Sequence, residues 1–194
     1  MKPAPFDYFA PTSLEEALDK LTDLGYSGKV LAGGQSLIPA MNFRMARPAA
    51  LVDLNKVNEL SYIKPTDDGG LAIGTMTRDS AIEDSEIVKR LFPIIAEVMP
   101  NIAHKQIRNR GTFGGAIAHA DPAAQIPALS LLLDAKMKIQ SKKGDRWVDA
   151  QDFFMGPFMT VLEPEDLLTE VLLPGLVPGT GSSYKQISCQ RGGY

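Results

Sequence analysis

Two glycine pairs, far apart in the chain, set the main constraint on how it folds. The first lies in "VLAGGQSLIP", where Gly33-Gly34 follow an apolar run and Ser36 supplies a hydroxyl group. The second lies in "RGTFGGAIAHADPAAQIP", where Thr112 precedes Gly114-Gly115. Glycine lets the backbone turn sharply and come close to a ligand, and successive N–H groups in such a bend form an anion nest. Two such loops that bind one dinucleotide pyrophosphate require a site between two lobes.

Taken alone, the first loop favours an ordinary strand-to-loop turn. Neither loop matches GxxxxGK[ST] or GxGxxG, so neither is a known phosphate-binding motif by itself. The occurrence of both loops in one chain favours a shared anion site, in which uncharged donors replace the usual lysine.

The N-terminal residues, 1–58, predict a small α/β lobe. "SLEEALDKLTDLG" has helical apolar spacing, with Ser13 and Glu16 at capping-box positions and Gly25 at the C-cap. "KVLA" and "ALVDL" are short apolar runs, typical of buried strands.

Residues 59–175 predict a second lobe that mixes helices with hairpins, which makes the fold class α+β. "LSYIKPTDDGGLAIG" and "AKMKIQSKKGDRWVDA" each place a turn signal between two β-type runs. "SAIEDSEIVKRLFPIIAEVM" predicts helix, with Ser85 as an N-cap and Pro93 as a break. "LLTEVLLP" and "SSYKQIS" predict further strands. "LPGLVPGTGSS" predicts a linker, so residues 176–194 are expected to form a linker and the start of another domain.

The composition excludes several classes of function. The apolar fraction of 44% and the charged fraction of 22% are ordinary for a globular protein. The net charge of -3 gives no support for nucleic-acid binding. The apolar runs are too short to span a membrane, and "MKPAPFDYFAP" lacks the apolar region of a signal peptide. These features predict a cytoplasmic location.

Cysteine and histidine limit the redox chemistry and the metal chemistry. Cys189 is the single cysteine, so the chain cannot supply the roughly four ligands of an iron–sulfur cluster. With only His104 and His119, a metal centre built from several imidazoles is not expected either. His119 follows the second glycine pair closely enough to be a candidate ligand contact. "KQIRNR", with Lys105, Arg108 and Arg110, favours a solvent-exposed basic face, although it could meet an acidic partner.

The ordered set of motifs resembles one known family. The segments are "FDYFAPTSLEEALDKL", "VLAGGQSLIPAMNFRMARPAALVDLN", "LAIGTMTRDSAIE", "RGTFGGAIAHADPAAQIPALSLLLDA", "LLTEVLLP" and "YKQISCQRGGY". Together they resemble the FAD-binding medium subunits of the molybdenum hydroxylases, the family of carbon monoxide dehydrogenase and xanthine dehydrogenase.

The resemblance implies a two-lobed FAD-binding domain of the vanillyl-alcohol oxidase (PCMH) type, with non-covalent FAD between the lobes. Residues 32–37 would wrap the pyrophosphate, and Thr112 with the second glycine pair would close its other side. Ile102, Ala103 and Ile107 match positions near the flavin and ribityl chain. The implied cofactor-binding residues are Ala32, Gly33, Gly34, Gln35, Ser36, Leu37, Ile102, Ala103, Ile107, Gly111, Thr112, Gly114, Gly115, His119, Gln125, Leu168, Lys185 and Tyr194.

The last four of these positions lie further along the chain than His119. Leu168 matches an apolar contact, Lys185 a lysine near the isoalloxazine, and Tyr194 a tyrosine close to the ring. Gln125 departs from the family, whose members often carry Asp or Glu there to bind FAD hydroxyls, so weaker binding is expected. The relatives also continue for about another domain, so a C-terminal domain is expected to be missing or truncated.

The function implied by the resemblance is electron transfer, with no catalytic residue for substrate chemistry on this chain. A large partner subunit would carry the molybdenum cofactor, and a small partner would carry the [2Fe–2S] clusters. FAD would pass electrons to NAD, a quinone or oxygen. Three alternatives stay open: an assembly or nucleotide-binding module that has lost FAD, a stand-alone FAD oxidoreductase, and a covalent flavoprotein that uses His104.

Overall fold

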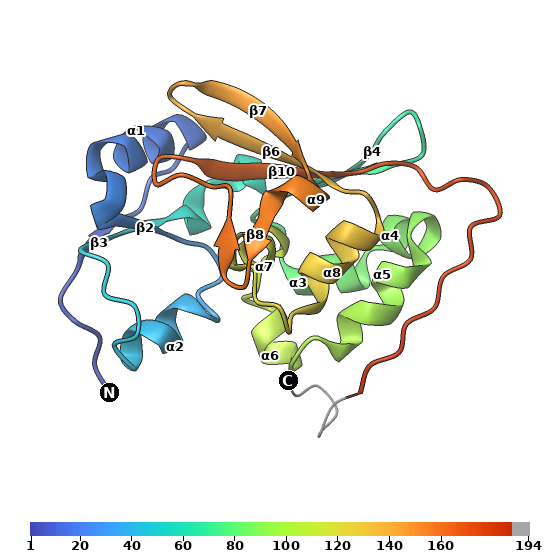
Figure 1. Ribbon diagram of the computed structural model, residues 1–194, viewed down its shortest axis with the longest axis horizontal. Helices are drawn as coiled ribbons and strands as arrows, with labels where there is room; N and C mark the ends of the chain where they lie inside the picture. The colour runs from blue at the N-terminus through green and yellow to red at the C-terminus, as the bar shows by residue number, and fades with distance from the viewer. Residues whose placement is uncertain (188–194) are drawn as a thin grey trace.

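The first lobe is built on a short parallel sheet. The structure, a computed structural model, describes residues 1–187. The sheet of the first lobe has three strands in the order β1-β3-β2. They are β1 (Asp7–Phe9), β2 (Gly28–Leu31) and β3 (Ala50–Asp53). Helix α1 (Leu14–Leu24) packs on this sheet, and the short α2 (Leu37–Asn42) follows β2 (Figure 1).

Local sequence explains why α1 starts and stops where it does. The Ser13 side chain accepts a hydrogen bond from the Glu16 N–H, which caps the N-terminus. Gly25 ends the helix with φ 48°, a conformation in which a side chain would be strained. The helix buries Ala17, Leu18 and Leu21, as its apolar spacing predicts.

The second lobe is an antiparallel sheet with helices on one side. The sheet order is β4-β5-β10-β6-β7, and every neighbouring pair is antiparallel. Its strands are β4 (Ile63–Pro65), β5 (Leu71–Gly74), β6 (Lys136–Ser141), β7 (Gly144–Asp149) and β10 (Leu167–Leu173). A small hairpin joins β8 (Phe154–Gly156) to β9 (Met159–Thr160).

The helices of this lobe lie below the five-stranded sheet in Figure 1. They are α3 (Asp79–Asp84), α4 (Glu86–Leu91), α5 (Pro93–Val98), α6 (Lys105–Arg108), α7 (Phe113–His119), α8 (Gln125–Leu132) and α9 (Ala150–Phe153). Short 3-10 helices occur in both lobes. They are η1 (Gly25–Ser27), η2 (Leu54–Lys56), η3 (Asn58–Leu60) and η4 (Met99–Asn101).

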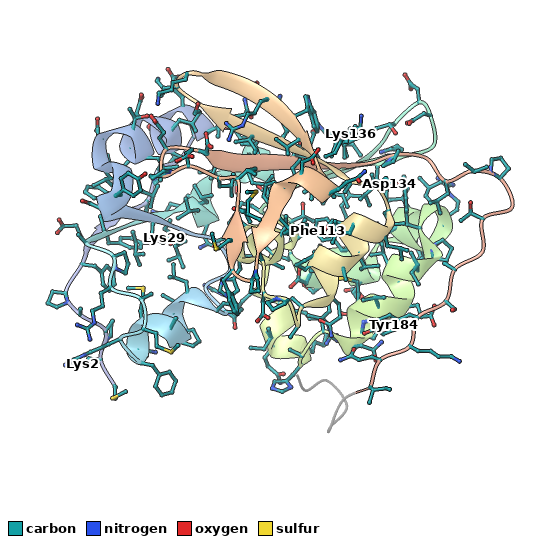
Figure 2. All side chains as sticks on the ribbon, viewed as in Figure 1. Lys2, Lys29, Phe113, Asp134, Lys136 and Tyr184 are labelled. Atoms are coloured by element: carbon teal, nitrogen blue, oxygen red, sulfur yellow. The ribbon has the colours of Figure 1, made fainter. Side chains whose placement is uncertain are left out.

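Two apolar clusters hold the fold together. The larger one fills the space between the five-stranded sheet and its helices, and it includes Phe92, Phe113 and Phe153. Phe113, labelled in Figure 2, lies near the middle of the molecule beneath that sheet. The smaller cluster joins α1 and β3 to Met76 and Leu167 of the second lobe. The two lobes therefore share a core.

Most of the predicted elements are confirmed. Both hairpins form, and the helical stretch from residue 80 divides into α3, α4 and α5. Ser85 caps α4 by accepting from the Val88 N–H, and Pro93 is the first residue of α5. Within the described residues, no helix is long and apolar enough to cross a membrane.

One predicted strand is wrong within the described part of the chain. Residues 182–187 of "SSYKQIS" are neither helix nor strand, and most of them are exposed, Ile187 fully so. An alternating pattern favours extended backbone, but a strand also needs a partner edge, and this segment pairs with neither side of the sheet. The predicted linker is likewise irregular as far as residue 187.

Candidate functional site

The first glycine loop, residues 32–36, connects β2 to α2. Gly34 has φ 75°, which favours glycine, and its carbonyl accepts from the Ile38 N–H at 3.1 Å. The Gln35 side-chain amide donates to the Gly33 carbonyl at 2.9 Å. Ser36 is exposed and its side chain makes no capping hydrogen bond with α2, so its hydroxyl is available to a ligand.

The second glycine loop, residues 110–115, leads into α7. Thr112 is the N-cap of this helix, and its hydroxyl accepts from the Gly115 N–H at 3.2 Å. The Gly114 N–H donates to the Thr75 carbonyl at 3.0 Å. Gly114 and Gly115 thus lie in a helical turn with both N–H groups used inside the chain, and they do not form the nest that the sequence predicts. A Cβ on Gly114 would lie 2.2 Å from the Thr75 Cβ, so this glycine permits close packing of α7 on β5.

The two glycine loops meet in space, although a long stretch of sequence separates them. A Cβ on Gly33 would lie 2.4 Å from the Arg110 carbonyl oxygen and 2.8 Å from the Gly111 Cα. A Cβ on Gly115 would lie 3.4 Å from the Ala32 Cβ. The two glycine loops are therefore in direct contact.

Two polar side chains that the sequence analysis missed lie between the loops. Asn55 donates from Nδ2 to the Ala32 carbonyl at 3.0 Å. Arg78 donates from Nη2 to Asn55 Oδ1 at 2.6 Å and from Nη1 to the Arg110 carbonyl. The sequence marks these two residues only by their place in the chain, because Asn55 comes shortly after the strand "ALVD" and Arg78 directly follows "GTMT".

A buried carboxyl group, Asp79, lies behind the second loop. A Cβ on Gly111 would lie 2.2 Å from Asp79 Oδ2, so a side chain at residue 111 would displace this carboxyl group. Asp79 is 4% exposed, and its Oδ1 has no hydrogen-bond partner among the described residues. Burial raises the pKa of Asp79 to about 7, and the charges of Arg78 and Arg108 oppose this shift.

The turn that contains Ile102 and Ala103 is held by a buried arginine. Ala103 has φ 43°, and the Arg108 Nη1 donates to the carbonyl of Ile102 at 2.9 Å and to that of Ala103 at 3.3 Å. Arg108 also binds both carboxylate oxygens of Glu83, at 2.7 and 3.1 Å. Arg108 is 7% exposed, so its assignment to a solvent-exposed basic face is wrong. Lys105 and Arg110 are exposed, as predicted.

Comparison with known proteins places the chain in a family. The sequence profile described as "FAD binding domain in molybdopterin dehydrogenase" matches residues 4–176. The chain belongs to this family. It is thus a member of the FAD-binding domains of molybdopterin dehydrogenases, as the motifs predicted.

Two similar proteins and one solved structure illustrate the relationship. The chain is 43% identical to the "6-hydroxypseudooxynicotine dehydrogenase complex subunit alpha" of Paenarthrobacter nicotinovorans, covering 100% of this chain and 65% of that protein. It is 40% identical to the "Carbon monoxide dehydrogenase medium chain" of Hydrogenophaga pseudoflava, covering 99% and 67%. A structure of carbon monoxide dehydrogenase from the same organism superposes with a TM-score of 0.96 at 40% identity, covering 100% of this chain and 67% of that one. The chain therefore spans about two thirds of the length of these relatives.

Several residues that the family resemblance singles out lie on the α8 side of the second lobe. Gln125 donates from Nε2 to the Asn101 carbonyl at 3.4 Å and to Gln186 Oε1 at 3.2 Å. The segment with the exposed Lys185 therefore passes next to Gln125 and to the turn at Ile102. Ile107 is half-buried in α6.

The remaining candidate positions lie at the ends of helices, in the core or beyond what the structure describes. His119 ends α7 with its ring 5.2 Å from that of Phe158. Leu168 is 4% exposed and belongs to the larger apolar cluster, so its side chain is part of the core. His104 is exposed at the N-cap of α6. Tyr194 and Cys189 lie outside the described residues.

The arrangement fits a dinucleotide better than a metal ion. Among the described residues there is no group of three or more His, Cys, Asp or Glu that could hold a metal. The first loop offers the exposed Ser36 hydroxyl and the Gln35 amide, which already donates to the Gly33 carbonyl. Such neutral donors suit phosphate oxygens, which accept hydrogen bonds only.

Proposed function

We propose that the chain binds FAD non-covalently between the two glycine loops. The contact of Gly33 with Arg110 and Gly111 is the observation that carries the proposal, because it brings both predicted halves of a pyrophosphate site together. Residues 32–37 would hold one side of the pyrophosphate, and the Thr112 end of α7 would lie on the other.

The proposed fold is the PCMH-type FAD domain, with the lobe boundary between residues 58 and 59. The separate parallel and antiparallel sheets support this division. Residues 176–194 would be a linker and the start of a further domain. The relatives' greater length supports this assignment.

The flavin environment would come from the second lobe. Ile102, Ala103 and Ile107 would contact the flavin and ribityl chain, and Lys185 would approach the ring. The Gln125 amide, already bonded to the Asn101 carbonyl, retains an oxygen that can accept from an FAD hydroxyl. His119, Leu168 and Tyr194 complete the proposed set of cofactor contacts.

The proposed role is that of an electron-transfer subunit in a molybdenum hydroxylase complex. Bound FAD would supply the redox chemistry, accepting electrons that come from [2Fe–2S] clusters and passing them to NAD, a quinone or oxygen. This chain would bind and orient the cofactor and exclude water from it. A large molybdopterin-binding subunit and a small iron–sulfur subunit are the proposed partners, and the relatives' names as complex subunits support them. A cytoplasmic location stays a prediction.

Flavin retention by the purified chain tests this proposal. The expected result is the visible absorption of oxidised flavin at one FAD per chain, released into solution on acid precipitation. Flavin that stays with the precipitated protein would indicate covalent attachment instead. A colourless protein that cannot be reconstituted with added FAD would contradict the proposal and favour the assembly module.

A further inference from the structure

A chain of side-chain hydrogen bonds crosses from the first glycine loop to the second. It starts at the Ala32 carbonyl, which accepts from Asn55 Nδ2 at 3.0 Å. Asn55 Oδ1 accepts from Arg78 Nη2 at 2.6 Å, and Arg78 Nη1 donates to the Arg110 carbonyl. Two side chains therefore connect a backbone carbonyl of one loop to a backbone carbonyl of the other.

Asn55 is itself held from the first lobe. Its backbone N–H donates to Asp53 Oδ1 at 2.9 Å, and Asp53 lies at the end of β3. The Tyr8 hydroxyl of β1 donates to the other carboxylate oxygen of Asp53. The amide thus has little freedom to turn away from the loops.

Arg78 is held from the second lobe by backbone pairing. It forms an isolated antiparallel bridge with Thr112. On either side of this bridge, the Asp79 N–H donates to the Gly111 carbonyl at 3.1 Å and the Phe113 N–H donates to the Thr77 carbonyl at 3.0 Å. The guanidinium therefore projects from a backbone that is already fixed to the second loop.

We propose that Asn55 and Arg78 are positioning residues that set the separation of the two glycine loops for the FAD pyrophosphate. This inference rests on the proposed function. A ligand held by two loops binds more tightly when their spacing is fixed beforehand, because less ordering is required on binding. Neither residue needs to touch the ligand for this effect.

The chemistry of the two side chains suits this role. A guanidinium is planar and donates along two fixed directions, so it can reach Asn55 and the Arg110 carbonyl at the same time. An amide both accepts from Arg78 and donates to Ala32, which a carboxylate cannot do. Arg78 also places a positive charge beside the loops, near the carboxyl groups of Asp79 and Asp53, and this charge favours an anion between the loops.

FAD titration of flavin-free protein tests the proposal, with flavin fluorescence as the signal. Arg78→Met and Asn55→Leu each remove the bridge, and we expect the Kd for FAD to rise about ten- to hundredfold. The double variant should bind about as weakly as the weaker single variant, because both substitutions break the same connection. Arg90→Met removes one exposed positive charge from α4 and is expected to leave the Kd unchanged.

The melting temperature of each flavin-free variant separates positioning from general stability. A merely structural role would lower the melting temperature and leave the Kd of the folded protein unchanged, which would overturn the proposal. If Arg78→Met does not fold, Asn55→Asp decides, since it keeps the acceptor for Arg78 and loses the donor to Ala32. An unchanged Kd for FAD in the Asn55→Asp variant would equally overturn the proposal. Absence of FAD binding by the unaltered chain would contradict the proposed function as well.

Discussion

Gly33 and Arg110 touch across the boundary between the two lobes. A Cβ added to residue 33 would lie only 2.4 Å from the Arg110 carbonyl oxygen. The same carbonyl accepts from Arg78, so it cannot move aside without breaking that hydrogen bond. A single missing side chain thus allows the two glycine loops to approach each other.

The first prediction follows from this contact. Replacing Gly33 with Ala or Val is expected to push the second loop away and to abolish stoichiometric flavin retention. Real Cβ atoms are essentially never found as close as 2.4 Å to another heavy atom, and the atom met here belongs to the backbone. The flavin-to-protein absorbance ratio after gel filtration measures the effect.

Gly181 provides the matched control for the Gly33 variants. A Cβ on Gly181 would meet nothing within 4 Å, and the residue lies in the irregular segment after β10. Gly181→Ala should therefore retain flavin like the parent chain. Full flavin occupancy in Gly33→Val would refute the shared site.

The second prediction concerns Gly114, whose close contact with Thr75 lies within the second lobe. Gly114→Ala would place a Cβ 2.2 Å from the Thr75 Cβ and force α7 away from β5. Such overpacking is expected to lower the free energy of unfolding by about 1–3 kcal/mol. Urea unfolding, followed by circular dichroism, measures this change. A loss of flavin with unaltered stability would contradict the packing role and indicate direct ligand contact.

Local patterns in the sequence predicted most elements of the fold. Helix α1 and both hairpins depend on apolar spacing and turn residues within about a dozen positions, so their signals are readable without tertiary contacts. Residues 182–187 show the limit, because their alternation says nothing about whether a sheet edge is free to pair with them.

The candidate site could be predicted only in part, for a related reason. The glycine loops carry a local signal, and their occurrence in one chain predicted that they act together, as the family resemblance also implied. Asn55, Arg78 and Arg108 acquire their roles from partners that are distant in sequence or from backbone carbonyls. A polar residue gives no sign of such a partner in the sequence itself, so Arg108 was assigned to the surface.

The third prediction tests the buried arginine. Arg108→Met is expected to lower the free energy of unfolding by about 3 kcal/mol, because it leaves Glu83 and two backbone carbonyls without their donor. The double variant with Glu83→Gln should recover part of this loss, since the uncompensated carboxylate is gone. Denaturant unfolding of the parent, Arg108→Met and the double variant measures both effects. Equal stability of Arg108→Met and the parent would show that the ion pair contributes nothing.

The last prediction uses the buried carboxyl group of Asp79. Its pKa is raised to about 7 in the folded chain, from an ordinary value of 3.8. Between these values the folded state keeps a proton that the unfolded state loses, so stability falls as the pH rises through this window and stays low above it. Asp79→Asn removes the charge at every pH. It should therefore flatten this decline and stabilise the chain above pH 7 by about 4 kcal/mol.

Thermal unfolding of the Asp79→Asn variant at a series of pH values from 4 to 8 measures this effect, with Asp84→Asn as the control. Asp84 lies at the other end of α3 and is exposed, so its replacement should leave the pH profile of the parent unchanged. The pKa of Asp79 is set mainly by burial, while Arg78 and Arg108 lower it. Arg108→Met should therefore move the decline in stability to higher pH. A profile for Asp79→Asn that matches the parent would show that the carboxyl group is ionised throughout this range, and that the two arginines outweigh its burial.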